Sequence, residues 1–339
     1  MFEYQIIVHP LGMMYGSGGG FLSPENLIAR SASKFPPDAA TLAGLFLSAN
    51  YSNAIKEELK EKLFVAGPFW KKQKAINEIF VPMPRNLVID KDDWDEWKLK
   101  KEGDRPVWYR DKPEVESQYS WQPISFWNKP KVIAKNKKNL KETPWTFTSI
   151  LHPTMERNQR SVLQKNGLFL ENAVQMEPEI CLVYLSTHSL EEGWYRFGGE
   201  NHLVEIECRK LQGDFLNWLK KPIDRAFALI TPGVWGSSRF SYRFPKNHAD
   251  FPEPVRMLTD KPVPYRYSTG GRLGLGRYAV PAGSVYVFDE PLNKTWWDFN
   301  PELFPCKKLF ETSEGLPKKE GLFKKFGCGL CLPVDIPGL

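Results

Sequence analysis

The sequence is poor in cysteine, since its 339 residues contain only Cys181, Cys208, Cys306, Cys328 and Cys331. An odd number of cysteines, in a chain long enough to bury a sizeable core, argues against a disulfide framework. The two thiols of Cys328-Gly329-Leu330-Cys331 have metal-like spacing, but no second pair stands at a fitting distance to complete a four-ligand zinc site. We therefore expect buried thiols here, and neither a metal nor any other cofactor.

Long apolar runs are also missing. No stretch approaches the roughly 20 apolar residues that a membrane helix needs. Residues 1–9 carry neither the basic region nor the long apolar core of a signal peptide. These absences predict a chain with no membrane partner, which works in the reducing cytoplasm.

The residues of familiar active sites are scarce or dispersed. The glycine-rich segment 16–20 lacks the Gly-Lys-Ser/Thr of a P-loop, and Phe21–Pro24 separates it from any following helix. No nucleophile motif or metal triad is visible, and the carboxylates are scattered. Of the five histidines, His152 alone lies among basic residues, so it is the one candidate for the general base of a metal-free ribonuclease. We expect that the chain is not an enzyme.

Aromatic side chains, by contrast, are abundant. They make up 14% of the chain and include 12 tryptophans, most of which must pack in cores or contact a partner. The formal net charge is +6. This mild basic excess permits an acidic partner such as nucleic acid but does not require one.

The order of the expected elements predicts an α+β fold. A β-branched strand at residues 4–8 precedes a helix at 39–49 with Asp38 as its N-cap, and further strands follow. Strands, a short helix at 215–220 and more strands recur later in the chain. Two split β-α-β units of ferredoxin-like (RRM-like) type would satisfy this order. We predict two such domains, at residues 1–175 and 176–339.

A large insertion is predicted at about residues 90–145, with much charge, tryptophan and proline and little regular structure. Its lysines form either a solvated loop or a phosphate contact. Its tryptophans either cover the domain's own core or bind a protein partner. The lysines are Lys129, Lys131, Lys135, Lys137, Lys138 and Lys141, and the tryptophans are Trp94, Trp97, Trp108, Trp121 and Trp127.

Glycine and arginine stand together in two places. The segment from Gly270 and Gly271 through Arg272 to Arg277 has four glycines and two arginines in eight residues, and Arg196 precedes Gly198-Gly199. Glycine lets the backbone approach a phosphate closely, and arginine adds charge and a planar stacking face. These segments are either RNA contacts or tight hairpins with solvated arginines.

Six short segments together resemble a known family. They are Phe35-Pro36-Pro37 with Thr41–Gly44, Val81–Pro84, Gly167–Phe169, Phe197–Glu200, Leu229–Pro232 and Val280–Tyr286. Their order and spacing resemble the third subunit of the Cmr complex, the type III-B CRISPR effector. That subunit belongs to the RAMP superfamily, in the group that caps the 5′ end of the guide RNA. The resemblance covers nearly the whole chain, and Val280–Tyr286 and Phe197–Glu200 are its most specific parts.

The resemblance implies two ferredoxin-like domains, no catalytic role, and recognition of the repeat-derived 5′ handle of the guide RNA. It implies docking on the large cyclase/nuclease subunit and on the first backbone RAMP subunit. In the family, the region before the first helix and a thumb-like hairpin lie on the handle. These correspond here to residues 28–35 and 152–160, with Arg30, Ser31, Lys34 and Phe35 in the first and His152, Arg157 and Arg160 in the second.

Two alternatives stay open at this point. The chain is a guide-processing endoribonuclease of the same superfamily that uses His152, or it is a protein-only scaffold whose aromatic insertion binds a partner. The terminal glycine-rich loop common in the superfamily is reduced here to Gly327-Cys328-Gly329.

Overall fold

The computed structural model describes the chain except residues 16, 19–31, 34, 51–53, 76–77, 104, 157, 160, 164–166, 200, 238–239, 247, 249–250, 270–271, 275 and 306–320. At 15, 17–18, 32–33, 169–171, 268–269 and 272–273 it describes the backbone alone. The fold is mixed α+β, mostly short strands in several sheets with few helices. Among the residues that the structure describes, no helix is long and apolar enough to cross a membrane.

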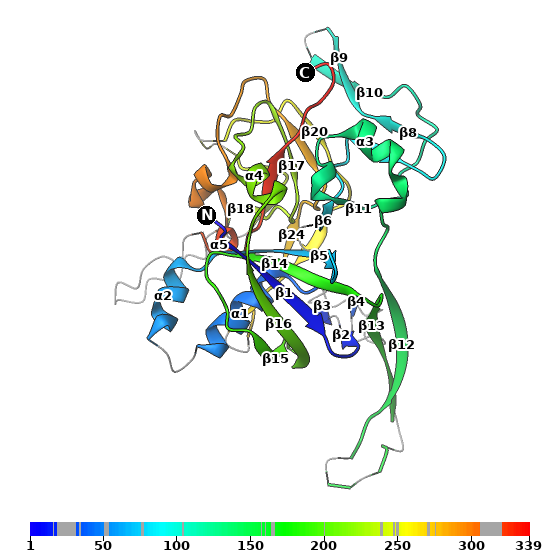
Figure 1. Cartoon of the computed structure of the whole chain (residues 1–339). Helices are drawn as coiled ribbons and strands as arrows, with labels where there is room; N and C mark the ends of the chain where they lie inside the picture. Colours follow the sequence, from blue (N-terminus) through cyan, green and yellow to red (C-terminus); the bar gives the residue numbers. More distant parts are fainter. Residues whose placement is uncertain are drawn as a thin grey trace.

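A seven-stranded antiparallel sheet forms the centre of the molecule (Figure 1). The first strand of the chain, β1 (Tyr4–Pro10), pairs on both sides, so that Ile7 lies opposite Val183 on one neighbour and Glu207 on the other. The strands, in spatial order, are β11 (Trp121–Pro123), β6 (Ile79–Pro82), β5 (Val65–Lys72), β14 (Ile180–Ser186), β1 (Tyr4–Pro10), β16 (His202–Lys210) and β15 (Gly193–Phe197).

Helices cover parts of both faces of this sheet. Helix α1 (Ala39–Ala49) packs Leu42 and Phe46 against Ile6 and Val8, and α2 (Ile55–Lys62) follows it. Helix α4 (Asp214–Lys220) lies on the opposite face, where Phe215 meets Phe69 edge-on at 5.3 Å between ring centroids. The predicted helix at 39–49 is therefore confirmed. Asp38 is its N-cap by position, although its side chain makes no capping hydrogen bond.

A second, four-stranded antiparallel sheet lies in the later part of the chain. Its spatial order is β20 (Arg256–Leu258), β25 (Val285–Val287), β17 (Ala226–Leu229) and β26 (Cys331–Pro333). Numbered along the chain, these strands lie in the order second, third, first, fourth. The inner strands β5, β14, β1 and β16 of the large sheet lie in the same order.

The two sheets differ in their crossover helices. A β-α-β-β-α-β unit has a helix in each of two crossovers. In the large sheet, α1 and α2 occupy the first crossover, and strand β15 occupies the second. In the small sheet, β18 (Trp235–Gly236) and β19 (Ser241–Tyr242) occupy the first crossover, and the short α5 (Leu322–Lys325) precedes the last strand. The large sheet takes strands from both sides of residue 175, because β14 and β16 pair with β1.

The expectation that residues 90–145 have little regular structure is wrong. Strand β8 (Trp94–Glu96) pairs with β7 (Leu87–Ile89), and β9 (Lys98–Glu102) forms a hairpin with β10 (Arg105–Tyr109). Helix α3 (Pro130–Lys135) and the 3-10 turns η2 (Ile124–Phe126) and η3 (Lys137–Asn139) follow, and β11 joins the central sheet. The insertion is thus built into the body.

The insertion is also tied to the end of the chain. The indole Nε1 of Trp127 donates to the Pro333 carbonyl at 2.9 Å, and the Leu99 amide donates to the Pro337 carbonyl at 2.8 Å. Trp127 is fully buried, while Trp94, Trp97, Trp108 and Trp121 are half-buried. The tryptophans of the insertion therefore contribute to the packing of the chain itself.

The remaining elements are short ribbons and turns, apart from one long hairpin. They are β2 (Met14–Tyr15), β3 (Ser17–Gly18), β4 (Ala32–Ser33), β12 (Trp145–Pro153), β13 (Leu168–Met176), β21 (Val263–Tyr265), β22 (Ser268–Thr269), β23 (Arg272–Leu273), β24 (Arg277–Ala279), η4 (Trp296–Asp298) and η5 (Pro301–Leu303).

Candidate nucleic-acid interface

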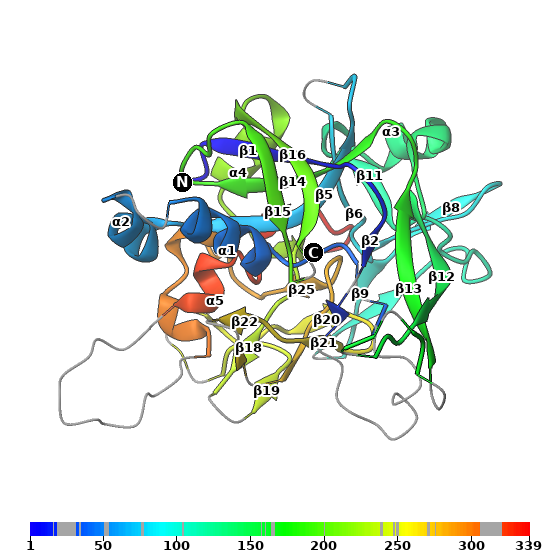
Figure 2. The ribbon, with the colours of Figure 1, turned by 90° about the horizontal axis from the view of Figure 1, so that it is seen from below.

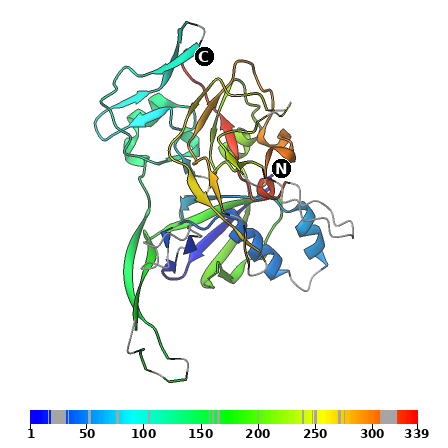
Figure 3. The ribbon, with the colours of Figure 1, turned by 180° about the vertical axis from the view of Figure 1, so that it is seen from behind.

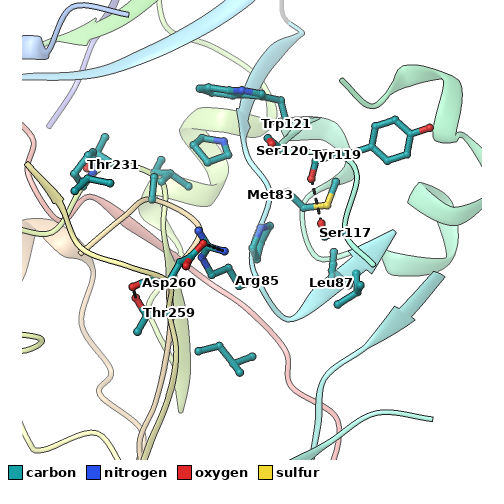
Figure 4. A pocket seen from close by; sticks show the side chains of 18 of the residues that line it. Met83, Arg85, Leu87, Ser117, Tyr119, Ser120, Trp121, Thr231, Thr259 and Asp260 are labelled. Carbon is teal, nitrogen blue, oxygen red and sulfur yellow. Dashed lines mark hydrogen bonds and ion pairs between the residues drawn. The ribbon is translucent and has the colours of Figure 1, made fainter. Parts of the chain in front are cut away.

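A large pocket lies between the two sheets and the insertion, and we call it the junction pocket (Figure 4). Its volume is about 1160 Å³. Its walls come from β5, β6 and the loop after β6, from residues 110–121 of the insertion, and from the β20–β21 region of the small sheet. Pockets of this size between structural units are common ligand sites.

Four of the six family-like segments meet at the junction pocket. Phe35-Pro36, Pro82–Pro84, Ile230–Pro232 and Ala282 all line it, although they are far apart in the sequence. The prolines fix their own backbone angles and have no amide hydrogen that needs a partner, so they make stiff walls. The segments that carry the resemblance are thus brought together by the tertiary fold.

Gly283 holds two of these segments in contact. Its backbone φ is +84°, and a Cβ added there would lie 2.6 Å from the Met83 carbonyl oxygen. The Arg85 amide donates to the Gly283 carbonyl at 2.8 Å, and the Gly283 amide donates to the Leu229 carbonyl at 2.7 Å. Any side chain at Gly283 would force the two sheets apart at the pocket wall.

Two guanidinium groups stand in the pocket lining. Arg85 Nη1 lies 3.3 Å from Asp260 Oδ2, and Figure 4 shows the two side chains beside each other. Arg110 lies 5.0 Å from the centroid of the Trp97 ring and donates to the Val115 carbonyl at 2.8 Å. Because Arg85 keeps about a third of its side-chain surface exposed (36%), its ion pair is open to exchange with another anion.

The long β12–β13 hairpin projects from the body beside the pocket, and we call it the β12–β13 arm (Figures 1 and 3). Its strands pair without a break from Trp145 opposite Met176 to Pro153 opposite Leu168. Trp145 anchors its base, since its ring lies 5.3 Å from Phe35 and 6.0 Å from Trp121, both of which line the pocket.

Beyond its base, the β12–β13 arm carries apolar side chains in the open. Phe147 is 45% exposed, and Leu151 and Leu168 are each 59% exposed. Alternation along a strand puts Phe147 and Leu151 on one face. Further out, Met155, Val162 and Leu163 are also exposed. Apolar side chains that lack a core to bury them indicate a contact surface.

A protein-family model matches residues 13–334 of the sequence, and its description is "CRISPR-associated protein (Cas_Cmr3)".

The chain belongs to the Cas_Cmr3 family.

This membership confirms the resemblance to the third Cmr subunit. No curated protein matches the sequence. A chain of the type III-B Cmr-beta complex bound to cognate target RNA is similar at 11% identity and a TM-score of 0.48, over 84% of this chain and 86% of that one. A chain of the Csm3-Csm4 subcomplex of the type III-A interference complex is similar at 10% identity and a TM-score of 0.43, over 85% and 93%.

Most of the residues predicted to bind RNA lie outside the described residues. They are Arg30, Ser31, Lys34, Arg157, Arg160, Gly270 and Gly271, and of Arg272 only the backbone in β23 is described. Their RNA contacts stay predictions. Phe35 lines the junction pocket, and His152 is half-buried on β12 opposite Phe169.

Of the two remaining predicted residues, Arg196 lies away from the pocket and the arm, whereas Arg277 lies on β24 opposite Tyr265, which lines the pocket. Arg196 is exposed on β15, at the opposite edge of the large sheet from β11. Arg277 is only 7% exposed, burial lowers the pKa of its guanidinium, and its Nη1 donates to the Ser237 carbonyl at 2.7 Å. The structure therefore brings Phe35 and the base of the arm together, but not Arg196 or Arg277.

Sequence reasoning missed Arg85 and Arg110. Arg85 directly follows the Val81–Pro84 segment, so its position beside a family motif was a usable signal. Arg110 had no such signal, because only the folding of the insertion brings it to the pocket. Strand β12 over residues 145–153, with its exposed apolar face, was also not predicted from the sequence.

The described residues contain no group of three or more histidine, cysteine, aspartate and glutamate side chains that could hold a metal ion. Cys181, Cys328 and Cys331 are buried free thiols, and Cys208 is half-buried. Burial raises the pKa of Cys181 to about 12 and raises that of Cys331 well above its usual value. The expectation of buried thiols at Cys328 and Cys331 is thus confirmed.

Proposed function

We propose that the chain is a non-catalytic subunit of a type III-B (Cmr) CRISPR effector complex and binds the 5′ handle of the guide RNA. One observation carries the proposal, together with family membership. Segments typical of the family, distant in sequence, converge on the junction pocket, and the β12–β13 arm rises from the wall of that pocket. We also infer that both sheets are ferredoxin-like units that have each kept helices in only one of the two crossovers.

The junction pocket offers the two kinds of contact that single-stranded RNA uses. Phe35, Trp97 and Trp121 give flat apolar surface for unstacked bases. Arg85 and Arg110 give positive charge for the sugar-phosphate chain. The exposed leucines of the arm then separate bases that leave the pocket, as apolar wedges do between base steps.

The handle contact extends to residues beyond the pocket. Arg30 and Lys34 precede Phe35 in the sequence, and Arg157 and Arg160 follow the end of β12, and we propose that all four add charge to the handle contact. We propose that the large cyclase/nuclease subunit and the first backbone RAMP subunit dock on other surfaces of the chain.

Two substitutions in the Arg85–Asp260 pair should change retention of the guide RNA in opposite directions. In the assembled complex, Arg85→Ala should weaken retention of a handle-bearing guide as salt is raised, because one phosphate contact is lost. Asp260→Asn should strengthen retention, because it frees Arg85 from its carboxylate. The measurement is nuclease protection of the handle across a salt series. Equal protection in both variants and the unmodified complex would refute a handle site in the pocket.

A cleavage assay tests the non-catalytic part of the proposal separately. The isolated protein is incubated with precursor RNA without metal, beside a His152→Ala variant. We expect no specific cut from either protein. Specific cleavage that His152→Ala abolishes would make the chain a processing endoribonuclease.

A further inference from the structure

Two segments of the later part of the chain are basic and free of acid. Residues 233–247 and 264–280 contain no aspartate or glutamate. In the first, aromatic and basic residues alternate closely, as Arg239-Phe240-Ser241-Tyr242-Arg243-Phe244-Pro245-Lys246. Basic residues interleaved with aromatic ones are typical of proteins that bind single-stranded nucleic acid. The cations of the two segments are Arg239, Arg243, Lys246, Arg266, Arg272 and Arg277.

The fold brings these two segments side by side. Strand β19 of the first segment contacts β24 of the second, and the Tyr278 amide donates to Ser241 Oγ at 3.1 Å. Figure 2 shows β18, β19, β21 and β22 gathered in one part of the molecule. Strands β19 and β24 therefore place Ser241 of the first segment next to Tyr278 of the second.

Two aromatic rings stand in the open on these two segments. Phe240 is 63% exposed and Tyr278 is 47% exposed. Two exposed cations stand on the same segment as Phe240, namely Arg243 and Lys246. Lys246 Nζ lies 5.4 Å from the centroid of the Tyr242 ring. We call Phe240, Arg243, Lys246 and Tyr278 the aromatic–basic surface.

The Phe240 backbone is tied to Ser237. The two residues are joined by two hydrogen bonds, from the Ser237 amide to the Phe240 carbonyl at 3.0 Å and from the Phe240 amide to Ser237 Oγ at 3.1 Å. At Gly236, where φ is +118°, an added Cβ would lie 2.1 Å from the Phe240 carbonyl oxygen. These contacts restrain the backbone of Phe240, which lowers the entropic cost of binding.

Buried Arg277 ties strand β24 to Ser237, the residue that is hydrogen-bonded to Phe240. Its guanidinium donates to the Ser237 carbonyl at 2.7 Å and lies 5.9 Å from the Phe323 ring. Arg277 is thus a positioning residue beneath the surface rather than a contact on it.

We propose that the aromatic–basic surface binds single-stranded RNA without sequence preference, with bases stacked on Phe240 and Tyr278 and phosphates beside Arg243 and Lys246. The inference rests on the proposed RNA-binding function and adds a second, sequence-tolerant contact outside the handle site. Stacking on exposed rings accepts every base, because each base has a flat π-face. The lack of carboxylates in both segments favours a polyanion over a protein partner.

The position of the surface agrees with a continuous RNA path. Val263, Pro264 and Tyr265 of β21 line the junction pocket, and Pro264 lies opposite Tyr278 in the β21–β24 ladder. One strand therefore separates the pocket from the exposed Tyr278 ring. An RNA chain that leaves the pocket over β21 reaches the aromatic–basic surface directly.

The test measures binding of a labelled 12-nucleotide oligouridylate, which has no handle sequence, to the full-length protein by fluorescence anisotropy. Phe240→Ala and Tyr278→Ala should each weaken binding by about tenfold, the size expected for loss of one base–ring stack. Phe240→Trp and Tyr278→Phe should retain near-normal affinity. Trp194→Ala is the matched control, because this exposed tryptophan (69%) lies on β15, away from both segments.

Salt dependence tests the charged half of the surface. Arg243→Gln with Lys246→Gln should reduce the slope of log Kd against log salt by about 1.4, since each phosphate contact to a single strand contributes about 0.7. Unchanged oligouridylate affinity in the Phe240→Ala/Tyr278→Ala double variant would overturn the proposal. So would normal RNA affinity combined with loss of the large subunit from the assembled complex, which would make the surface a protein interface.

The assembled complex distinguishes the source of the RNA. Photo-crosslinking from 4-thiouridine is measured at the aromatic–basic surface with guide RNA alone and with guide plus target RNA. A crosslink with guide alone assigns the surface to the guide, and one that needs target assigns it to the target. Absence of crosslinks in both arms contradicts the proposal. Handle protection, followed in the same samples, reports separately on the proposed function.

Discussion

Trp145 and Phe147 stand two residues apart on the same strand, and they mark the border between two regions. Trp145 is 7% exposed and packs between Phe35 and Trp121 at the junction pocket. Phe147 is 45% exposed at the start of the free part of the β12–β13 arm. The pocket is lined by segments that are far apart in the sequence and pack together in the fold. The arm is a local hairpin whose apolar side chains have no core to bury them. Similar side chains therefore stabilise the fold in one region and remain available to a partner in the other.

Shortening each aromatic side chain should separate the two regions most clearly. Trp145→Ala should lower the free energy of unfolding by about 3–5 kcal/mol, because it leaves a cavity at the base of the arm. Phe147→Ala should change it by less than about 0.5 kcal/mol, since its ring is half in solvent. Denaturant unfolding of both variants measures the difference. Equal losses would show that the arm is not energetically separate from the pocket.

The pocket wall should be intolerant of added bulk at Gly283. Gly283→Val should cost about 3 kcal/mol, because a positive φ is strained for a branched residue and its Cβ meets the Met83 carbonyl. Gly44→Ala is the matched control, since nothing lies within 4 Å of an added Cβ there. That exposed helical site should gain about 0.5–1 kcal/mol. Thermal or denaturant unfolding that ranks Gly283→Val as harmless would remove this glycine's structural role.

The arm should show the reverse pattern, with little stability at stake and a marked effect on RNA. Leu151→Ser with Leu168→Ser should leave unfolding within about 0.5 kcal/mol of the parent, because both side chains are largely exposed. In the assembled complex the same variant should release the handle-bearing guide about tenfold more readily, through loss of the wedge contacts. Guide dissociation is followed by competition with unlabelled guide. An unchanged dissociation rate would leave the apolar face of the arm without an RNA role.

The elements predicted best were those whose pattern is local. The helix at 39–49 forms where expected, the helix predicted at 215–220 is α4, and the strand predicted at 4–8 is β1. In the insertion the prediction failed, because its strands are three to five residues long and several of its contacts are remote in sequence. Trp121 pairs with Pro82, and Leu99 donates to Pro337. Strands this short contain too few residues for their alternating pattern to be recognised in the sequence.

The site was only partly predictable for the same reason. The family-like segments were visible as motifs, but nothing local said that four of them share one pocket. Phe35 was predicted and lines that pocket, while Arg85 and Arg110 were missed. Arg277 was predicted as a contact because glycines surround it, yet its side chain is buried and donates to the Ser237 carbonyl. The exposed ring of Phe240 lies in a segment where basic and aromatic residues alternate, which is a pattern visible in the sequence.

The family, the mixed α+β class and the basic, aromatic character of the chain could all be predicted from its residues alone. These properties follow from motifs and composition, which need no knowledge of distant contacts. Only the tertiary structure decided which motifs meet, which aromatic rings are buried and which arginines face solvent. The physical reason is that burial and proximity arise from long-range strand pairing, such as Val8 of β1 with Leu182 of β14 and Tyr4 of β1 with Lys210 of β16.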